Sequence, residues 1–110
     1  MMCFDDLVAA IAALERSDLD AWIREELVVS RQEAGTPLFN DMECARVRLI
    51  CTLHYDLEVD ADTLPLVLSL IDQLYELRGA LHAVEGAVAQ QPRDIQDAIR
   101  AALRRGRNPA

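Results

Sequence analysis

The sequence contains no lysine and few aromatic residues, and both shortages limit what the protein can be. All 11 basic residues are arginine, against 19 acidic residues, so the formal net charge is −8. Aromatic residues make up only 5% of a chain that is 52% hydrophobic, so the core must be built mainly from Leu, Val, Ile and Ala. This composition suits helices better than a β-sandwich. We therefore expect a small, mainly α protein with an acidic surface.

We expect neither a secretory leader nor a membrane-spanning run. The first ten residues, MMCFDDLVAA, are acidic where a leader would be basic. No stretch reaches the roughly eighteen uninterrupted apolar residues that a membrane helix needs. The three cysteines, Cys3, Cys44 and Cys51, are an odd number and do not suggest a disulfide framework. We expect a cytoplasmic protein with reduced thiols and no membrane partner.

The charge is unevenly distributed along the chain. Residues 1–92 contain 6 arginines and 17 acidic residues, a net charge of −11, whereas residues 93–110 contain 5 arginines and 2 acidic residues, a net charge of +3. An acidic body repels a phosphate backbone, so we expect its partners to be basic protein surfaces rather than nucleic acid. The arginine-rich tail is expected to cap its own helix and pair with the acidic body, although contact with an anion or nucleic acid is the alternative.

Residues 61–90 carry the clearest pattern, a heptad of apolar residues typical of a helix that pairs with another helix. A second apolar row covers only the first half, through Leu64, Leu68, Ile71 and Tyr75. We predict a long coiled-coil-type helix that forms a homodimer, with a monomeric bundle as the alternative. The predicted dimerisation residues are Val67, Leu70, Leu74, Leu77, Leu81, Val84 and Val88.

The first sixty residues predict a small domain of short elements. We expect helices over residues 4–14 and 17–27, the second capped by Ser17, and a hairpin with strands at 27–30 and 36–39 around a turn at 33–35. The apolar stripe of the second helix places Trp22 in the core. The predicted domains are therefore residues 1–60, winged-helix-like, and residues 61–110, the long helix and a C-terminal amphipathic helix.

Two further helices complete the prediction. Asn40 is expected to cap a helix whose core face includes Cys44, Val47, Ile50, Cys51 and Leu57, with Glu43 bonding back to the cap. Arg46 and Arg48 are expected to point away from the core. After Pro92, residues 93–105 form the amphipathic helix, which Gly106 is expected to end.

No arrangement of residues points to catalysis. Cys44 and Cys51 share a helix face, and His54 lies three residues after Cys51. A zinc site or a nucleophilic pair would need a third partner or a denser motif. Buried small apolar side chains are the better interpretation of both cysteines. We expect no enzyme activity and no cofactor.

The element order, together with Gly35, Phe39 and the segment 43–49, resembles the MerR-like winged-helix superfamily. The segments 45–50, 53–57 and especially LPLVLSLIDQL (64–74), followed by QQP (90–92), resemble the chaperone-modulator CbpM family. The resemblance covers roughly residues 19–92. It implies an adaptor that binds the J-domain of a DnaJ-like co-chaperone of the CbpA type and inhibits its stimulation of DnaK and its DNA binding.

The chain departs from a DNA-binding MerR-type regulator where cations would be needed. The second helix is mostly acidic, and Pro37 stands where the wing would carry an arginine. A MerR-type transcriptional regulator stays the alternative function, and a dimeric scaffold with an unrelated partner is a third. Unless they are ordinary solvated charges, the J-domain would be bound by Asp72, Glu76, Asp18, Asp20, Glu25 and Glu26.

Overall fold

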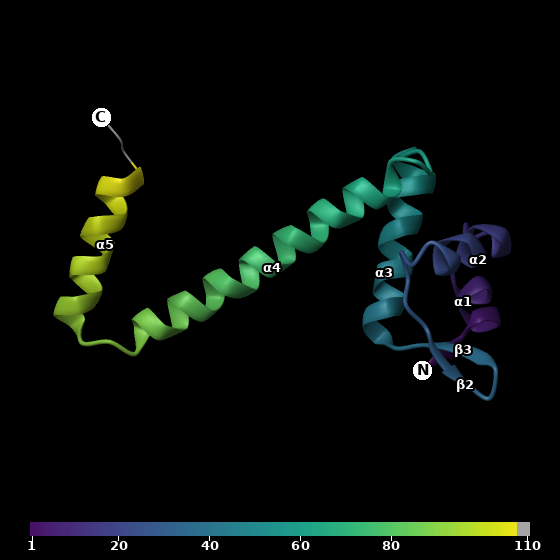
Figure 1. Cartoon of the computed structure of the whole chain (residues 1–110), viewed down its shortest axis with the longest axis horizontal. Coiled ribbons are helices and arrows are strands. Elements are labelled where there is room, and N and C mark those ends of the chain that lie inside the picture. Colours follow the sequence, from purple (N-terminus) through teal and green to yellow (C-terminus); the bar gives the residue numbers. More distant parts are fainter. Residues whose placement is uncertain (108–110) are drawn as a thin grey trace. The chain divides into compact units, whose positions relative to one another are not determined.

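The computed structural model describes residues 1–107 as two compact units, one formed by Met1–Ser69 and one that begins at Leu70. The chain is mainly helical with a small antiparallel sheet, which confirms the predicted mainly α class with a hairpin (Figure 1). The helices are α1 (Phe4–Ala10), α2 (Arg16–Arg24), α3 (Asp41–Cys51), the π-helical turn η1 (Thr52–Asp56), α4 (Leu64–Ala89) and α5 (Arg93–Arg107).

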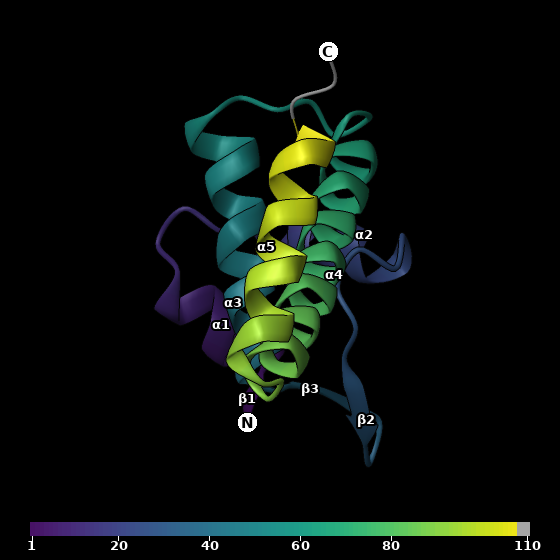
Figure 2. The ribbon, with the colours of Figure 1, turned by 90° about the vertical axis from the view of Figure 1, so that its left-hand side faces the viewer.

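Three short strands form the sheet of the N-terminal unit, in the order β1 (Met2–Cys3), β3 (Thr36–Phe39) and β2 (Arg31–Glu33). Ala34 and Gly35 both have positive φ, 50° and 77°, which is the geometry of a two-residue hairpin turn that follows the strand twist. The hairpin protrudes beneath the helices of this unit in both views (Figures 1 and 2). The prediction of its first strand at 27–30 is wrong, because Leu27 and Val28 are buried in the core instead.

The first two helices are shorter than predicted. α1 ends at Ala10, because the backbone of Ile11 is extended and its side chain is buried in the core. α2 begins after Glu15, so Ser17 is not its cap, and it ends at Arg24. Glu26 then adopts φ 61°, the left-handed conformation that stops a helix.

The cap of α3 is confirmed. The Asn40 side chain accepts a hydrogen bond from the backbone N–H of Glu43 at 2.8 Å. The carboxylate of Glu43, however, accepts from the N–H of Val29 at 3.2 Å rather than reaching back to Asn40. Arg46 does not point away as predicted, because its Nε donates to the carbonyl of Leu27. Both contacts tie the segment after α2 to α3.

The core of the N-terminal unit takes side chains from almost every element. It confirms the burial of Trp22 and of four of the five core residues predicted around α3, whereas Leu57 is 64% exposed and the prediction for it is wrong. The most deeply buried side chains are Leu7, Leu19, Val28, Phe39, Val47, Ile50, Leu64 and Leu68.

The long helix α4 begins inside this core. Leu64 and Leu68, from the second apolar row of the prediction, are buried, while Tyr75 from the same row is exposed. The first turns of α4 therefore belong to the N-terminal unit, and its continuation from Leu70 belongs to the second.

A short connection at residues 90–92 separates α4 from α5. The side-chain amide of Gln96 donates to the carbonyl of Gln91 at 2.8 Å and to that of Ala89 at 3.3 Å, which fixes this junction. α5 runs through Gly106 to Arg107, so the prediction that Gly106 ends the helix is wrong. None of the helices within residues 1–107 is both long and apolar enough to cross a membrane.

Candidate functional site

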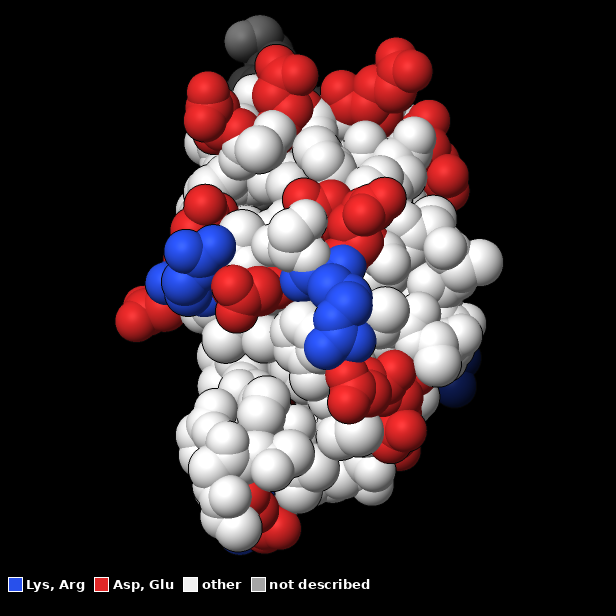
Figure 3. Space-filling model, turned by 90° about the vertical axis from the view of Figure 1, so that its right-hand side faces the viewer, with Lys and Arg blue, Asp and Glu red and all other residues white. Residues whose placement is uncertain are grey.

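The surface of the N-terminal unit is strongly acidic. Met1–Ser69 contains 5 arginines and 14 acidic residues, a net charge of −9, whereas the remaining residues contain 6 arginines and 5 acidic residues, a net charge of +1. Among the described residues no charged side chain is buried, so the acidic groups all reach the solvent. Figure 3 shows acidic side chains over much of one face, with few basic ones between them. Such a surface attracts cationic partners and repels phosphates.

Four of the six predicted partner-binding residues lie together in sequence and in the same unit. Asp18 and Asp20 lie on α2, and Glu25 and Glu26 follow its last turn, both exposed. Asp72 and Glu76 lie on α4 in the second unit, where Asp72 is half-buried and Glu76 exposed. The acidic end of α2, rather than Asp72, is therefore the more accessible part of the predicted set.

Asp18 has a structural partner that the sequence did not reveal. Its carboxylate accepts a hydrogen bond from the Tyr55 hydroxyl at 2.5 Å, and that hydroxyl accepts from the N–H of Glu15 at 3.2 Å. Burial, followed by the hydrogen bond to Asp18, raises the pKa of Tyr55 above its usual value. Trp22 and His54 pack against the Tyr55 ring, with centroids 6.2 Å and 5.2 Å away. Asp18 thus helps to anchor α2 on η1, besides any role in binding.

The cations of α2 and the hairpin are paired with nearby carboxylates. Arg16 Nη1 lies 2.7 Å from Asp5 Oδ1, and the Arg16 guanidinium lies 5.0 Å from the centre of the Phe4 ring. Arg24 approaches Asp20 at 3.5 Å, and Arg31 of the hairpin approaches Glu33 at 3.7 Å. α2 and the hairpin therefore offer arginines that already lie beside carboxylates of the same unit.

The predicted seam of α4 is an exposed apolar stripe. Its five central residues are between 57% and 67% exposed, and Val67 and Val88 at the two ends are half-buried. Beyond Leu68 no residue of α4 is buried. A continuous stripe of large apolar side chains in water is typical of surfaces that contact another protein. The central residues are Leu70, Leu74, Leu77, Leu81 and Val84.

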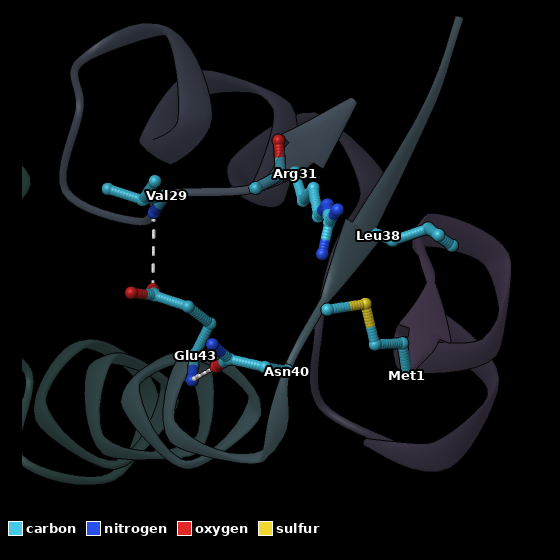
Figure 4. Close-up of a pocket in the computed structure, with 7 residues that line it drawn as sticks. Met1, Val29, Arg31, Leu38, Asn40 and Glu43 are labelled. Carbon is cyan, nitrogen blue, oxygen red and sulfur yellow. Dashed lines mark hydrogen bonds between the residues drawn. The ribbon is translucent and has the colours of Figure 1, made fainter. Parts of the chain in front are cut away.

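One pocket in the N-terminal unit lies beside the hairpin. It is an open hollow of about 400 Å³ between the hairpin, the segment after α2 and the start of α3. In the close-up, the Glu43 carboxylate accepts a hydrogen bond from the backbone N–H of Val29 (Figure 4). The Asn40 side chain accepts one from the backbone N–H of Glu43. Because these polar groups already hold the fold together, we assign no ligand to this hollow.

The thiols and His54 also have structural roles. Cys44 and Cys51 are buried and free, and burial raises the pKa of the Cys51 thiol from 9.0 to about 11. A thiol with a raised pKa is a poor nucleophile at neutral pH. His54 Nδ1 lies 2.8 Å from the carbonyl oxygen of Val59. Within residues 1–107, no three His, Cys, Asp or Glu side chains come close enough together to hold a metal ion.

Two surfaces stand out as candidate functional sites, the acidic face of the N-terminal unit and the apolar seam of α4. Both suit contacts with protein surfaces. Protein-family models, curated proteins and solved structures provide no match to this chain.

Proposed function

We propose that this protein is a dimeric adaptor that binds a basic protein surface, and that its partner is the J-domain of a CbpA-type co-chaperone. The observation that carries the proposal is the net charge of −9 on the N-terminal unit, all of it at the surface. The resemblance to the CbpM family supplies the identity of the partner. The three free cysteines support a cytoplasmic setting.

Inhibition follows from competition for one surface. A J-domain presents a basic face to an acidic surface of DnaK, so a small acidic protein can cover that face and exclude DnaK. Electrostatic complementarity of this kind speeds association and makes binding sensitive to salt. The exposed end of α2, at Glu25 and Glu26, offers carboxylates that no fold contact described above requires.

The proposal includes a homodimer formed by the seam of α4. Leucine side chains that stay more than half exposed in one chain lose that contact with water when two seams meet. A dimer presents two acidic units at once, which raises the apparent affinity for a partner that also has two copies of its basic face.

The proposal also includes the MerR-like winged-helix assignment, which is supported by the order helix, helix, hairpin, helix and long helix. This order is the one observation that favours the alternative function, a DNA-binding regulator. The charges oppose it, because carboxylates of α2 would face phosphates.

The test is calorimetric titration with the isolated J-domain of a CbpA-type protein at low and physiological ionic strength. We expect binding that weakens as salt is added, since salt screens charges over about 8 Å at physiological ionic strength. The variant Glu25→Arg should weaken it further. Its matched control is Glu33→Arg on the hairpin, which makes the same change of charge on another exposed residue.

The outcomes separate the functions. Equal weakening by both variants would show that only net charge matters and would remove the end of α2 from the binding surface. No binding at either salt concentration would overturn the adaptor function. Retention on a column of immobilised duplex DNA at physiological salt would favour the DNA-binding regulator instead.

A further inference from the structure

The last helix, α5, carries an apolar row and a basic stripe on neighbouring faces. No residue of α5 is buried, and its apolar row of Ile95, Ile99 and Leu103 remains half-buried or exposed. On another face, arginines recur at helical spacing and form a basic stripe of Arg93, Arg100, Arg104 and Arg107. A helix with an apolar row beside a basic stripe fits a surface that combines exposed leucines with carboxylates.

In the N-terminal unit, the segment that leads into α4 offers exposed residues of both kinds. Four exposed acidic residues alternate along it, and residues 49–77 contain no arginine or lysine. Leu57 within this segment and Leu66 at the start of α4 are 64% and 61% exposed. We call residues 56–62 the acidic segment; its acidic residues are Asp56, Glu58, Asp60 and Asp62.

Helix lengths limit how far α5 could reach if it folded back along α4 of its own chain. α4 has 26 residues and α5 has 15, so at a rise of about 1.5 Å per residue they span about 39 Å and about 22 Å. If α5 folded back along α4, it would end roughly 17 Å before Leu64. The basic stripe would then face the middle of its own α4 and not the acidic segment.

The seam of α4 is complementary to itself when two copies run in opposite directions. A two-fold axis at Leu77 sets Leu77 against its own copy and Leu70 against Val84. It also brings Leu74 and Val67 to within one residue of the positions opposite Leu81 and Val88. Such near self-complementarity of the seam is what a symmetric antiparallel dimer requires.

Charge selects this antiparallel arrangement over the parallel one. A parallel pair would bring together two N-terminal units of net charge −9 and two tails of net charge +3. An antiparallel pair brings the tail of each chain to the acidic unit of the other.

We propose that α5 of each copy docks on the acidic segment of a second copy, with its apolar row on Leu57 and Leu66 and its basic stripe on the carboxylates. The proposal rests on the pairing of α4 that the proposed function includes. It gives the dimer two reciprocal contacts between copies besides the seam, and it neutralises the acidic segment while the end of α2 stays available to a partner.

Two charge-reversal variants test this docking. The first, Arg104→Glu/Arg107→Glu, makes the basic stripe acidic, and the second, Glu58→Arg/Asp62→Arg, makes the acidic segment basic. Each variant alone should form a weakened homodimer, because like charges meet at both contacts. In a heterodimer of the two, both contacts join opposite charges. Native mass spectrometry of the mixture should show heterodimer in roughly threefold to tenfold excess over the random proportion at low ionic strength.

Matched controls carry the same charge changes elsewhere. Arg24→Glu/Arg31→Glu replaces the first variant and Glu25→Arg/Glu33→Arg the second, all at exposed positions. This control pair should mix at the random proportion. If it gives the same excess as the test pair, general charge attraction explains the result and the docking proposal fails.

The remaining outcomes separate this inference from the proposed function. Stable dimers that exchange at random in the test mixture would overturn the docking of α5 and leave the α4 dimer in place. A protein that stays monomeric before any substitution would overturn both. Neither result bears on J-domain binding by the acidic face, which calorimetry measures independently.

Discussion

Leu77→Ala is expected to weaken the dimer more than truncation of an exposed apolar residue outside the seam. Leu77 lies at the centre of the seam and is 67% exposed in the single chain. In an antiparallel pair it contacts its own copy across the two-fold axis, so one substitution removes two leucine side chains from the contact. Alanine is a strong helix former, so α4 itself should stay intact.

The size of the effect follows from the exposed fraction. Burying a whole leucine side chain contributes about 1.5–3 kcal/mol. Because two-thirds of Leu77 is exposed before pairing, each copy loses about 1–2 kcal/mol of that contribution, and the dimer about 2–4 kcal/mol. The dissociation constant should therefore rise roughly 30-fold to several hundred-fold.

Sedimentation equilibrium over a range of protein concentrations measures this change, and circular dichroism checks that the variant keeps its helices. The control is Met42→Ala, a truncation of an 81% exposed side chain on α3, which should leave the dissociation constant unchanged. Equal dissociation constants for Leu77→Ala and the unaltered protein would show that the seam does not pair through its centre and would refute the argument.

Three further predictions concern the stability of the N-terminal unit, measured by urea denaturation. Tyr55→Phe removes the hydroxyl that donates to Asp18 and should lower the free energy of unfolding by about 1–2 kcal/mol. Asn40→Ala removes the cap that accepts from the N–H of Glu43 and should cost about 1 kcal/mol. Because burial raises the pKa of Cys51 from 9.0 to about 11, the unfolded thiol ionises first as pH rises, so the unfolding free energy should fall between those pH values in the presence of reductant.

Each of these predictions has a control. Tyr75→Phe removes the hydroxyl of an exposed tyrosine and should change stability little. Asn40→Asp keeps an oxygen acceptor at the cap and should retain most of its contribution. A Cys51→Ala variant should lose the fall in stability that Cys51 contributes at alkaline pH; a fall of unchanged size would assign the effect to other groups.

Much of the helical part of the protein could be predicted from local patterns. The heptad rows placed a long helix over 61–90, and α4 covers Leu64–Ala89. The cap at Asn40 and the burial of Trp22 were predicted as well, since each depends on residues within a few positions along the chain. Short-range periodicity and capping are set by the helix repeat, so the sequence alone reports them.

The errors in the prediction occur where distant segments meet. β1 has only two residues and exists because Met2 and Cys3 pair with Phe39 and Leu38, which no local pattern could indicate. Residues 27–30 were expected to form a strand. Leu27 and Val28 are instead packed in the core of the N-terminal unit. Apolar residues in a short run are consistent with a strand or with irregular core structure, and only the packing partner decides between them.

Some properties of the candidate surfaces follow from the sequence, and others depend on packing. The net charge, its uneven distribution and the spacing of the seam are properties of the sequence by itself, because charge and helical period need no knowledge of neighbours. Which carboxylates are accessible was decided by the tertiary structure, which binds Asp18 to Tyr55 thirty-seven residues away and leaves Glu25 and Glu26 exposed. Likewise, the sequence determined two apolar rows on α4, but only packing against the N-terminal core decided that Leu64 and Leu68 are buried and that the row through Leu77 stays exposed. A row becomes core or interface according to what lies against it, and that is a property of the fold.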